Sequence, residues 1–229
     1  MIWPPRKLLW AVGGAVVLFV LLAAAPSWLS GVEFFRVRQL ELVGIRNLQP
    51  DALIAALDLP AGASVWDDLD PPVARVRALP GVADARLVRR WPGALKLIVR
   101  ETTPVALVPG VRGLQVVDAA GRTLPFDPTR TGLDLPVAQA ADSALVGLLA
   151  RVQVTDPALF REVTAARRVR GDVVLELGAR RLLLRRDAGP EVILGVSLVV
   201  QDLAARGRPY IELDGRFAGQ VVVRRRATA

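Results

Sequence analysis

The chain has 229 residues, a formal net charge of +8, and neither cysteine nor histidine. Without these two residue types it cannot form a disulfide, a Cys-His or Ser-His-Asp catalytic site, or a zinc site with His and Cys ligands. The basic charge would suit nucleic acid, anionic lipid or an acidic partner, and a genome biased toward arginine codons is the simpler explanation for it. No nucleic-acid recognition motif accompanies the charge, so we predict no nucleic-acid partner.

Residues 1–7 and 8–29 predict a short cytoplasmic tail followed by a transmembrane helix. Leu8–Ala25 contains no charged side chain, its length is close to the minimum for a bilayer span, and Trp28 suits the headgroup region. A cleaved signal peptide is the alternative, because the alanines before Pro26 resemble a cleavage site. The length of the apolar run and the proline after that site favour an uncleaved anchor. The two basic residues of the tail favour an N-terminus in the cytoplasm, with the bulk of the chain outside.

A strand, two helices and two further strands are predicted between residues 34 and 106. Phe34–Gly44 alternates like a strand whose phase slips after Arg38, which indicates a bulge or bend. Pro50–Leu59 predicts a short helix with proline in its first turn. Asp70-Pro71 predicts the N-cap and first turn of a second helix, which ends before Pro80-Gly81.

The hairpin that follows is the most sharply patterned stretch of the chain. Its tight turn is Trp91-Pro92-Gly93, in which proline fixes φ and glycine allows a positive φ. Apolar and charged residues alternate on both flanking strands, which is typical of a sheet with one buried face. The residues expected to share the buried face are Ala83, Ala85, Leu87, Leu95, Leu97 and Val99.

The rest of the chain predicts an α+β domain with a mainly antiparallel sheet. The expected helices are Asp142–Val154 and Pro190–Arg206. The expected strands are Leu114–Asp118, Arg122–Phe126, Val163–Val169, Val173–Leu177, Arg181–Arg186, Tyr210–Leu213 and Gln220–Arg225.

Catalytic and metal-binding patterns are weak throughout. The acidic cluster Asp67-Asp68-x-Asp70 has oxygen ligands for calcium, but it lacks the following glycine and the distal glutamate of a calcium loop. No serine has a lysine or another base at a motif spacing. We therefore predict no enzyme activity, no metal, no cofactor and no small-molecule substrate.

The stretch Pro80–Ala106, together with the anchor and the strand before it, resembles the FtsQ/DivIB family of bacterial cell-division proteins. The resemblance is carried by Phe35, Val37, Gly44, Pro80, Val82, Arg89, Trp91, Pro92, Leu95, Val99, Glu101, Pro104, Val105 and Ala106. It implies a single-pass membrane protein with a POTRA domain of order β-α-α-β-β at residues 34–103. A mainly antiparallel α+β C-terminal domain would follow at residues 104–229.

The resemblance also implies partners and the surfaces that bind them. In this family the C-terminal strands receive a small bitopic coiled-coil protein of the FtsB/DivIC type. By resemblance, strand addition would involve Phe217, Gly219, Val221 and Val223, with Arg167 and Arg168 as cationic partners of an acidic segment. A second surface would comprise Arg89, Arg90 and Glu101. The alternative for each residue is plain core or plain solvated surface.

The function implied is that of a non-catalytic scaffold in the cytoplasmic membrane at the division septum. It would hold FtsB-type and FtsL-type partners and, through them, influence the peptidoglycan synthase pair FtsW and FtsI. Two alternatives remain open: a secreted basic protein that binds cell wall or polyanions, and a POTRA protein of outer-membrane export. The first alternative needs a cleaved N-terminus. The second is disfavoured because POTRA proteins of outer-membrane export carry a C-terminal β-barrel, for which the chain after Ala106 is too short.

Overall fold

The structure is a computed structural model that describes residues 33–111, 113–129, 133–217 and 219–225. The chain divides into two compact units, Met1–Glu101 and Thr102–Ala229. The predicted tail and transmembrane helix at 1–7 and 8–29 lie outside the described residues. In the part of the chain that is described, no helix has the length and apolar character needed to cross a membrane.

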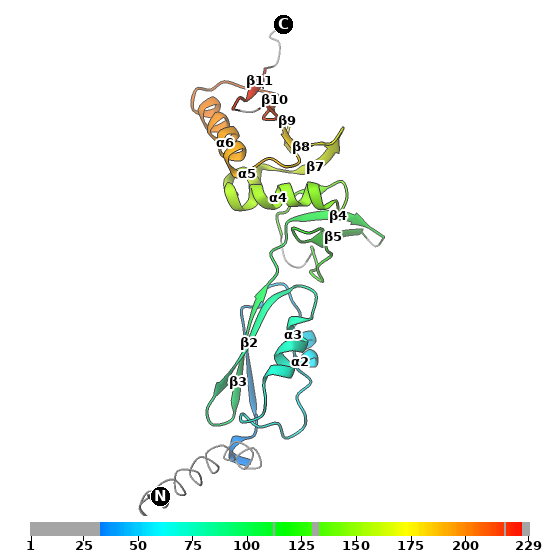
Figure 1. Cartoon of the computed structure of the whole chain (residues 1–229), viewed down its shortest axis with the longest axis vertical. Coiled ribbons are helices and arrows are strands. Elements are labelled where there is room, and N and C mark those ends of the chain that lie inside the picture. The colour runs from blue at the N-terminus through cyan, green and yellow to red at the C-terminus, as the bar shows by residue number, and fades with distance from the viewer. Residues whose placement is uncertain (1–32, 112, 130–132, 218, 226–229) are drawn as a thin grey trace, which may run out of the picture. The chain divides into compact units, whose positions relative to one another are not determined.

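The first unit has the predicted order of elements and a three-stranded sheet (Figure 1). Its elements are the 3-10 turn η1 (Glu33–Phe35), β1 (Gln39–Val43), α2 (Pro50–Leu57), α3 (Asp70–Arg77), β2 (Val82–Arg90) and β3 (Ala94–Glu101). β3 lies in the middle, parallel to β1 and antiparallel to β2. Leu95 and Leu97 of β3 are buried together with Leu53, Leu57 and Val76 of the two helices, which form the core of this unit.

Three local predictions in this unit need correction. The strand expected over Phe34–Gly44 is divided into η1, an isolated bridge and β1. Ala83 is exposed, because the register of β2 shifts between Val82 and Asp84 and moves it off the buried face. Asp70 is the first helical residue of α3 rather than its N-cap, because proline is tolerated throughout the first turn and does not mark which residue precedes the helix.

The second unit is built on an eight-stranded sheet in the order β11-β10-β9-β8-β7-β6-β4-β5. Its strands are β4 (Ala106–Gly110), β5 (Gly113–Val117), β6 (Val137–Ala138), β7 (Ala165–Val169), β8 (Asp172–Leu177), β9 (Arg180–Arg185), β10 (Glu212–Asp214) and β11 (Val222–Arg224). Its helices are α4 (Ser143–Thr155), α5 (Pro157–Glu162) and α6 (Pro190–Ala205).

The sheet of this unit is mixed, which corrects the expectation of a mainly antiparallel sheet. The pairs β4–β6, β6–β7 and β9–β10 are parallel. α4 and α5 connect β6 to β7, and α6 connects β9 to β10. Such a helical crossover returns the chain to the end where the previous strand began, so the next strand runs parallel.

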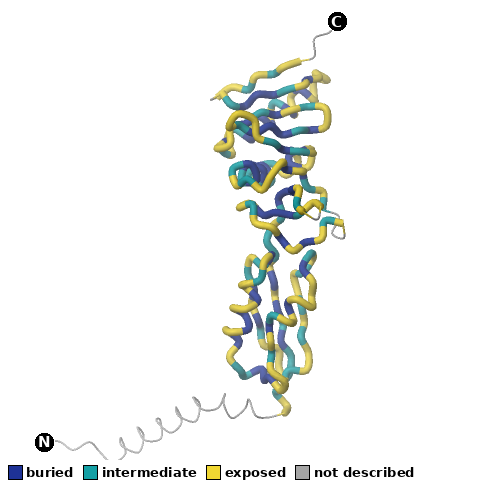
Figure 2. The backbone as a smooth tube through the Cα atoms, turned by 90° about the vertical axis from the view of Figure 1, so that its right-hand side faces the viewer, coloured by how far each residue is buried: buried dark blue, intermediate teal, exposed yellow. Residues whose placement is uncertain are grey.

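One face of this sheet carries the main core. Leu175 and Leu184 of the strands pack with Leu148, Leu149 and Ile193 of the helices, all of them buried. Figure 2 shows the same distribution along the backbone, with buried residues in the strands and helices and exposed residues at the turns.

Three elements of the second unit were not predicted: β4, α5 and the two-residue strand β6. The run Val105–Val108 is buried throughout, so it lacks the alternation of a half-exposed strand, yet it forms most of β4. β5 therefore pairs with β4, and the expected strand Arg122–Phe126 contributes an isolated bridge from Thr123 to Val117. α5 is only six residues long, which is too short for a periodic pattern.

Candidate partner-binding site

β11 is the outermost strand at one edge of the eight-stranded sheet. It pairs antiparallel with β10, with Val223 opposite Leu213 and Val222 opposite Asp214. Val223 and the preceding Val221 are partly buried against the core, whereas Val222 points to the other face and is 49% exposed. Because neighbouring side chains alternate along a strand, the outward apolar contact of β11 is Val222.

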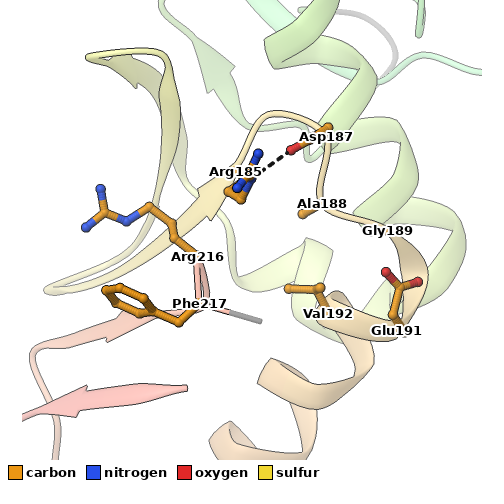
Figure 3. Close-up of a pocket in the computed structure, with 9 residues that line it drawn as sticks. Arg185, Asp187, Ala188, Gly189, Glu191, Val192, Arg216 and Phe217 are labelled. Atoms are coloured by element: carbon orange, nitrogen blue, oxygen red, sulfur yellow. Dashed lines mark hydrogen bonds and ion pairs between the residues drawn. The ribbon is translucent and has the colours of Figure 1, made fainter. Parts of the chain in front are cut away.

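Phe217 and Gly219 lie in the loop between β10 and β11. The Phe217 ring is 52% exposed and lines a hollow of about 260 Å³ (Figure 3). The other lining residues are Arg185, Asp187, Ala188, Gly189, Glu191, Val192, Gly215 and Arg216. Gly219 has a φ of 69° and open space where a Cβ would lie, so it serves the turn rather than a close contact.

Arg216 fixes the inner side of this hollow. Its guanidinium donates to both carboxylate oxygens of Asp214, at 2.6 and 2.8 Å, and to Asp172 of β8 at 3.0 Å. The side-chain hydrogen bond from Arg216 lowers the pKa of Asp214, and the same two carboxylates raise the pKa of Arg216. The Arg216 guanidinium thus links Asp214 of β10 to Asp172 of β8 and holds the start of the 215–217 loop against the sheet.

The outer rim of the hollow carries balanced charge. Arg185 and Asp187 form an ion pair at 3.2 Å, and hydrogen bonding from Arg185 lowers the pKa of Asp187. Glu191 lies in the first turn of α6. The lining thus offers donors, acceptors and the apolar faces of Phe217 and Val192, a combination that suits a peptide with mixed side chains.

Arg167 and Arg168 do not adjoin the terminal strand. They lie on β7, four strands from β11, which places them roughly 19 Å away at ~4.8 Å per strand. Arg167 forms an ion pair with Glu176 at 3.2 Å, and Arg168 hydrogen-bonds to Asp142 at the start of α4. As neighbours on one strand they face opposite sides of the sheet, and each already has an acidic partner.

The three residues of the second predicted surface are spread along the hairpin of the first unit. Arg89 lies near the turn, and its guanidinium donates to the carbonyl oxygens of Val65 and Asp67. Glu101 ends β3 and is six residues along the sheet from the position opposite Arg89, about 20 Å away. Arg90 is exposed, and its side chain makes no hydrogen bond or ion pair within the described ranges.

Glu101 has a structural task that the sequence did not reveal. Its carboxylate accepts hydrogen bonds from the backbone N–H groups of Arg46, Asn47 and Leu48, at 2.8 to 3.1 Å. The side-chain amide of Asn47 adds a fourth donor at 2.9 Å. Glu101 therefore anchors the loop between β1 and α2 and is not free for a partner.

The acidic residues at 67–70 are likewise engaged locally. The Asp67 carboxylate accepts from the backbone N–H of Ser64 at 2.7 Å, and the Asp68 carboxylate accepts from that of Asp70 at 3.0 Å. Over the residues that the structure describes, no group of three or more acidic side chains is placed to hold a metal ion.

Arg216 and Val222 are the residues that sequence reasoning missed at this site. The position of Arg216 two residues after Asp214 is the signal in the sequence that could have indicated an Asp-Arg pair. The second acceptor, Asp172, lies 44 residues away in sequence and could not be assigned without the sheet order. Val222 was missed because the sequence does not show which face of β11 meets the core, and so whether Val222 or its neighbours Val221 and Val223 point outward.

Known proteins of similar sequence match parts of this chain. The family model described as "POTRA domain, FtsQ-type" matches residues 35–102. A protein named "Cell division protein FtsQ" from Rhodothermus marinus is 38% identical over 127 residues, covering 52% of this chain and 44% of the relative. One of the same name from Streptomyces collinus is 35% identical over 109 residues, covering 46% and 41%.

A longer alignment reaches into the second unit. A protein named "Cell division protein FtsQ" from Myxococcus fulvus is 28% identical over 221 residues, covering 85% of this chain and 75% of the relative. The chain spans less than half the length of the two relatives of higher identity. Since the matched segment 35–102 coincides with the β-α-α-β-β unit, that unit is a POTRA domain of the FtsQ type, and the chain is similar to cell-division proteins named FtsQ.

Proposed function

We propose that this protein is a non-catalytic scaffold of the bacterial division machinery. It is anchored in the cytoplasmic membrane by residues 8–29, with a POTRA domain at 34–103 and a partner-binding domain at 104–229 outside. It binds FtsB/DivIC-type and FtsL-type coiled-coil proteins at the septum and, through them, acts on FtsW and FtsI. The names of its relatives and the type of its POTRA domain support this proposal.

The position of β11 at the sheet edge is the observation that carries the binding site. An edge strand has unpaired backbone N–H and C=O groups that can accept the strand of another chain. Val221 and Val223 hold β11 on the core, which keeps that edge in a fixed position. Phe217 beside the hollow (Figure 3) then supplies one side-chain contact to the partner, and Val222 on the strand supplies another.

The other predicted site residues do not contact the added strand directly in this proposal. Gly219 permits the turn that brings Phe217 back toward β11. Arg167 and Arg168 would meet a segment of the partner distant from the added strand, and only after giving up Glu176 and Asp142. In the POTRA domain, Arg90 is the predicted contact residue that is free to bind.

The test is the binding of the full-length chain in detergent to purified FtsB-type and FtsL-type proteins from the same genome. Phe217→Asp/Val222→Asp is expected to weaken binding at least about tenfold, or ~1.4 kcal/mol, since charges then face the added strand. Leu198→Asp is the matched control, because Leu198 is 66% exposed on α6, which is not part of the sheet. Circular dichroism checks that both variants fold.

Equal affinity of the double variant and the wild type would refute the edge-strand site. An equal loss in Leu198→Asp would show that the outer face of α6, and not the strand edge, receives the partner. Absence of binding by the folded wild-type chain would refute the scaffold function itself.

A further inference from the structure

Four aromatic rings gather at one end of the first unit, near the turn between β2 and β3. We call Phe34, Phe35, Trp66 and Trp91 the aromatic tip. Phe35 meets the other three edge-on, with ring centroids 5.2 Å from Phe34, 5.9 Å from Trp66 and 5.8 Å from Trp91. The two indole rings lie 4.5 Å apart. Such edge-on and tilted pairs are the favourable geometries of aromatic rings.

The backbone that carries these rings is cross-linked. The backbone N–H of Arg38 donates to the Gly93 carbonyl at 2.8 Å, which ties the segment after η1 to the hairpin turn. The N–H of Val65 donates to the Phe35 carbonyl at 3.0 Å, and Arg89 holds the 65–67 segment from β2. The tip is therefore a preorganised surface rather than three separate loops.

Two of the four rings are directed outward. Phe34 is 56% exposed and Trp91 is 53% exposed, whereas Phe35 and Trp66 are only partly exposed beneath them. Large exposed aromatic side chains on a rigid base are unusual for a solvated surface and indicate a contact. Tryptophan in particular is enriched where one side of a surface is apolar and the other is wet.

Arginines surround the outward rings. Arg36 forms an ion pair with Glu33 at 3.1 Å, Arg38 donates to the Glu33 carbonyl at 2.9 Å, and Arg90 has no side-chain partner among the described residues. The nearby Asp67 and Asp68 carboxylates face backbone donors of their own loop. Outward charge at the tip is thus mainly guanidinium, which complements phosphate.

The sequence brings a membrane close to this surface. The apolar stretch predicted to span the bilayer ends at residue 29, and η1 begins at Glu33. Four residues of chain reach at most roughly 14 Å. If residues 8–29 span the bilayer, the aromatic tip lies within about that distance of the headgroups.

We propose that the aromatic tip rests in the interfacial layer of the membrane. Phe34 and Trp91 lie among the headgroups, and Arg36, Arg38 and Arg90 bind the phosphates of anionic lipids. This contact goes beyond the proposed scaffold function and is independent of β11, since it involves the first unit alone. It would set the height and tilt of the POTRA domain above the bilayer.

Spin labelling of the full-length chain in lipid nanodiscs tests this proposal. The chain has no cysteine, so a single introduced cysteine is labelled uniquely. Arg90→Cys places a nitroxide beside the outward rings and leaves both rings in position; it removes one of the three arginines and keeps Arg36 and Arg38 for the lipid phosphates. Ala83→Cys is the matched control, because it is exposed on the same strand, seven residues away or roughly 23 Å along β2.

In discs containing phosphatidylglycerol, the label at residue 90 is expected to be several-fold more accessible to oxygen than to a water-soluble nickel chelate, relative to the label at residue 83. Adding Phe34→Ser/Trp91→Ser should remove that difference while circular dichroism remains unchanged. In discs of phosphatidylcholine alone the difference should shrink, since the arginines then lose their anionic lipid.

Equal accessibility at residues 90 and 83, or no response to the serine substitutions, would overturn the membrane contact. Dipolar broadening between labels at residue 90 would identify a second copy of the chain as the occupant of the tip and overturn it as well. Equal depth in both kinds of disc would overturn the assignment of the arginines to lipid phosphate.

Discussion

Glu101 shows how one side chain can look like a surface contact and act as a structural anchor. A carboxylate that accepts several backbone N–H groups satisfies donors that would otherwise lose their hydrogen bonds on folding. Its four donors lie 53 to 55 residues earlier in the chain. The charge at position 101 therefore joins the end of β3 to the loop after β1.

We expect Glu101→Gln to loosen that loop. Hydrogen bonds to a charged group contribute about 1.5–3 kcal/mol, so the amides of residues 46–48 should exchange with deuterium roughly 10 to 100 times faster. Glu41→Gln is the control, because Glu41 is a solvent-exposed partner of Lys96 at 2.8 Å and contributes at most about 1 kcal/mol. Unchanged exchange at 46–48 in Glu101→Gln would contradict the anchoring role.

Asp142 is a second residue whose charge has a defined local effect. It is the N-cap of α4 and accepts from the backbone N–H groups of Ala144 and Leu145 at 2.8 and 3.2 Å. The side-chain hydrogen bond from Arg168 lowers the pKa of Asp142. A depressed folded-state pKa means that this stabilisation is complete above the unfolded pKa, about 4, and is lost as pH falls further.

Asp142→Asn should therefore destabilise the second unit in a pH-dependent way. Asparagine still caps a helix but cannot pair with Arg168, so we expect a loss on the order of 1 kcal/mol at pH 7. Thermal unfolding from pH 7 down to pH 2 should show the gap between variant and wild type closing below about pH 4. A gap that stays constant over that range would argue against an ionised Asp142 as its source.

At the scale of elements, the close approach of the chain after β1 to β3 requires a glycine at position 44. Gly44, just after β1, has a φ of 87°, and a Cβ built there would lie 2.1 Å from the carbonyl oxygen of Val99. Gly62 has a similar φ of 89° with nothing within 4 Å of the corresponding position. Alanine substitution at each of the two glycines therefore distinguishes the free-energy cost of the positive φ from the cost of steric overlap.

Gly62→Ala should destabilise by about 1 kcal/mol through its positive φ alone, and Gly44→Ala by clearly more, because the backbone of β3 must also move. Deuterium exchange of the β1 and β3 amides measures the difference. Equal effects of the two substitutions would show that β3 yields to the added methyl group without cost.

The hairpin of β2 and β3 was predictable because apolar and charged residues alternate on both strands and Pro92-Gly93 marks the turn between them, although Gly93 does not have the positive φ that glycine would allow. The buried set Ala85, Leu87, Leu95, Leu97 and Val99 follows the period of two. A bulge breaks that period locally, which is why Ala83 was misplaced. The order of the POTRA elements was recoverable, since capping prolines and glycines mark each boundary.

The second unit was less predictable for physical reasons. β4 is buried on both faces and β6 has only two residues, so neither presents a pattern. Strand order depends on packing between distant segments, which single-sequence periodicity does not report. At the candidate site the last strand could be anticipated, but its outward residue, Val222, depended on which valines meet the core.

At the scale of the whole molecule, the net charge of +8 bears on how partners are found. If the partner segment is acidic, long-range attraction raises the association rate, and salt screens that attraction within about 10 Å at 0.1 M. We expect the association rate to fall about tenfold or more between 50 and 500 mM salt, with little change in dissociation. A rate measured by stopped-flow that is independent of salt would contradict a role for the basic charge.

The scaffold account separates functions between the two units. The POTRA domain carries the aromatic tip, for which we propose a membrane contact, and the eight-stranded sheet carries the edge strand that we propose as the partner site. The sheet has two outer strands, β11 and β5. β5 is partly covered by the hydrogen bond from the N–H of Leu124 to the Val116 carbonyl, at 2.8 Å. Because this hydrogen bond occupies part of the β5 edge, β11 is the edge strand better suited to pair with a strand of another chain.

Deuterium exchange of the full-length chain with and without its FtsB-type partner tests this claim most directly. The account predicts that the partner slows exchange at the amides of Val222–Arg224, with the amides of Gly113–Gln115 in β5 unchanged. Protection confined to β5, to the POTRA domain or to the outer face of α6, with β11 unaffected, would contradict strand addition at the C-terminal edge.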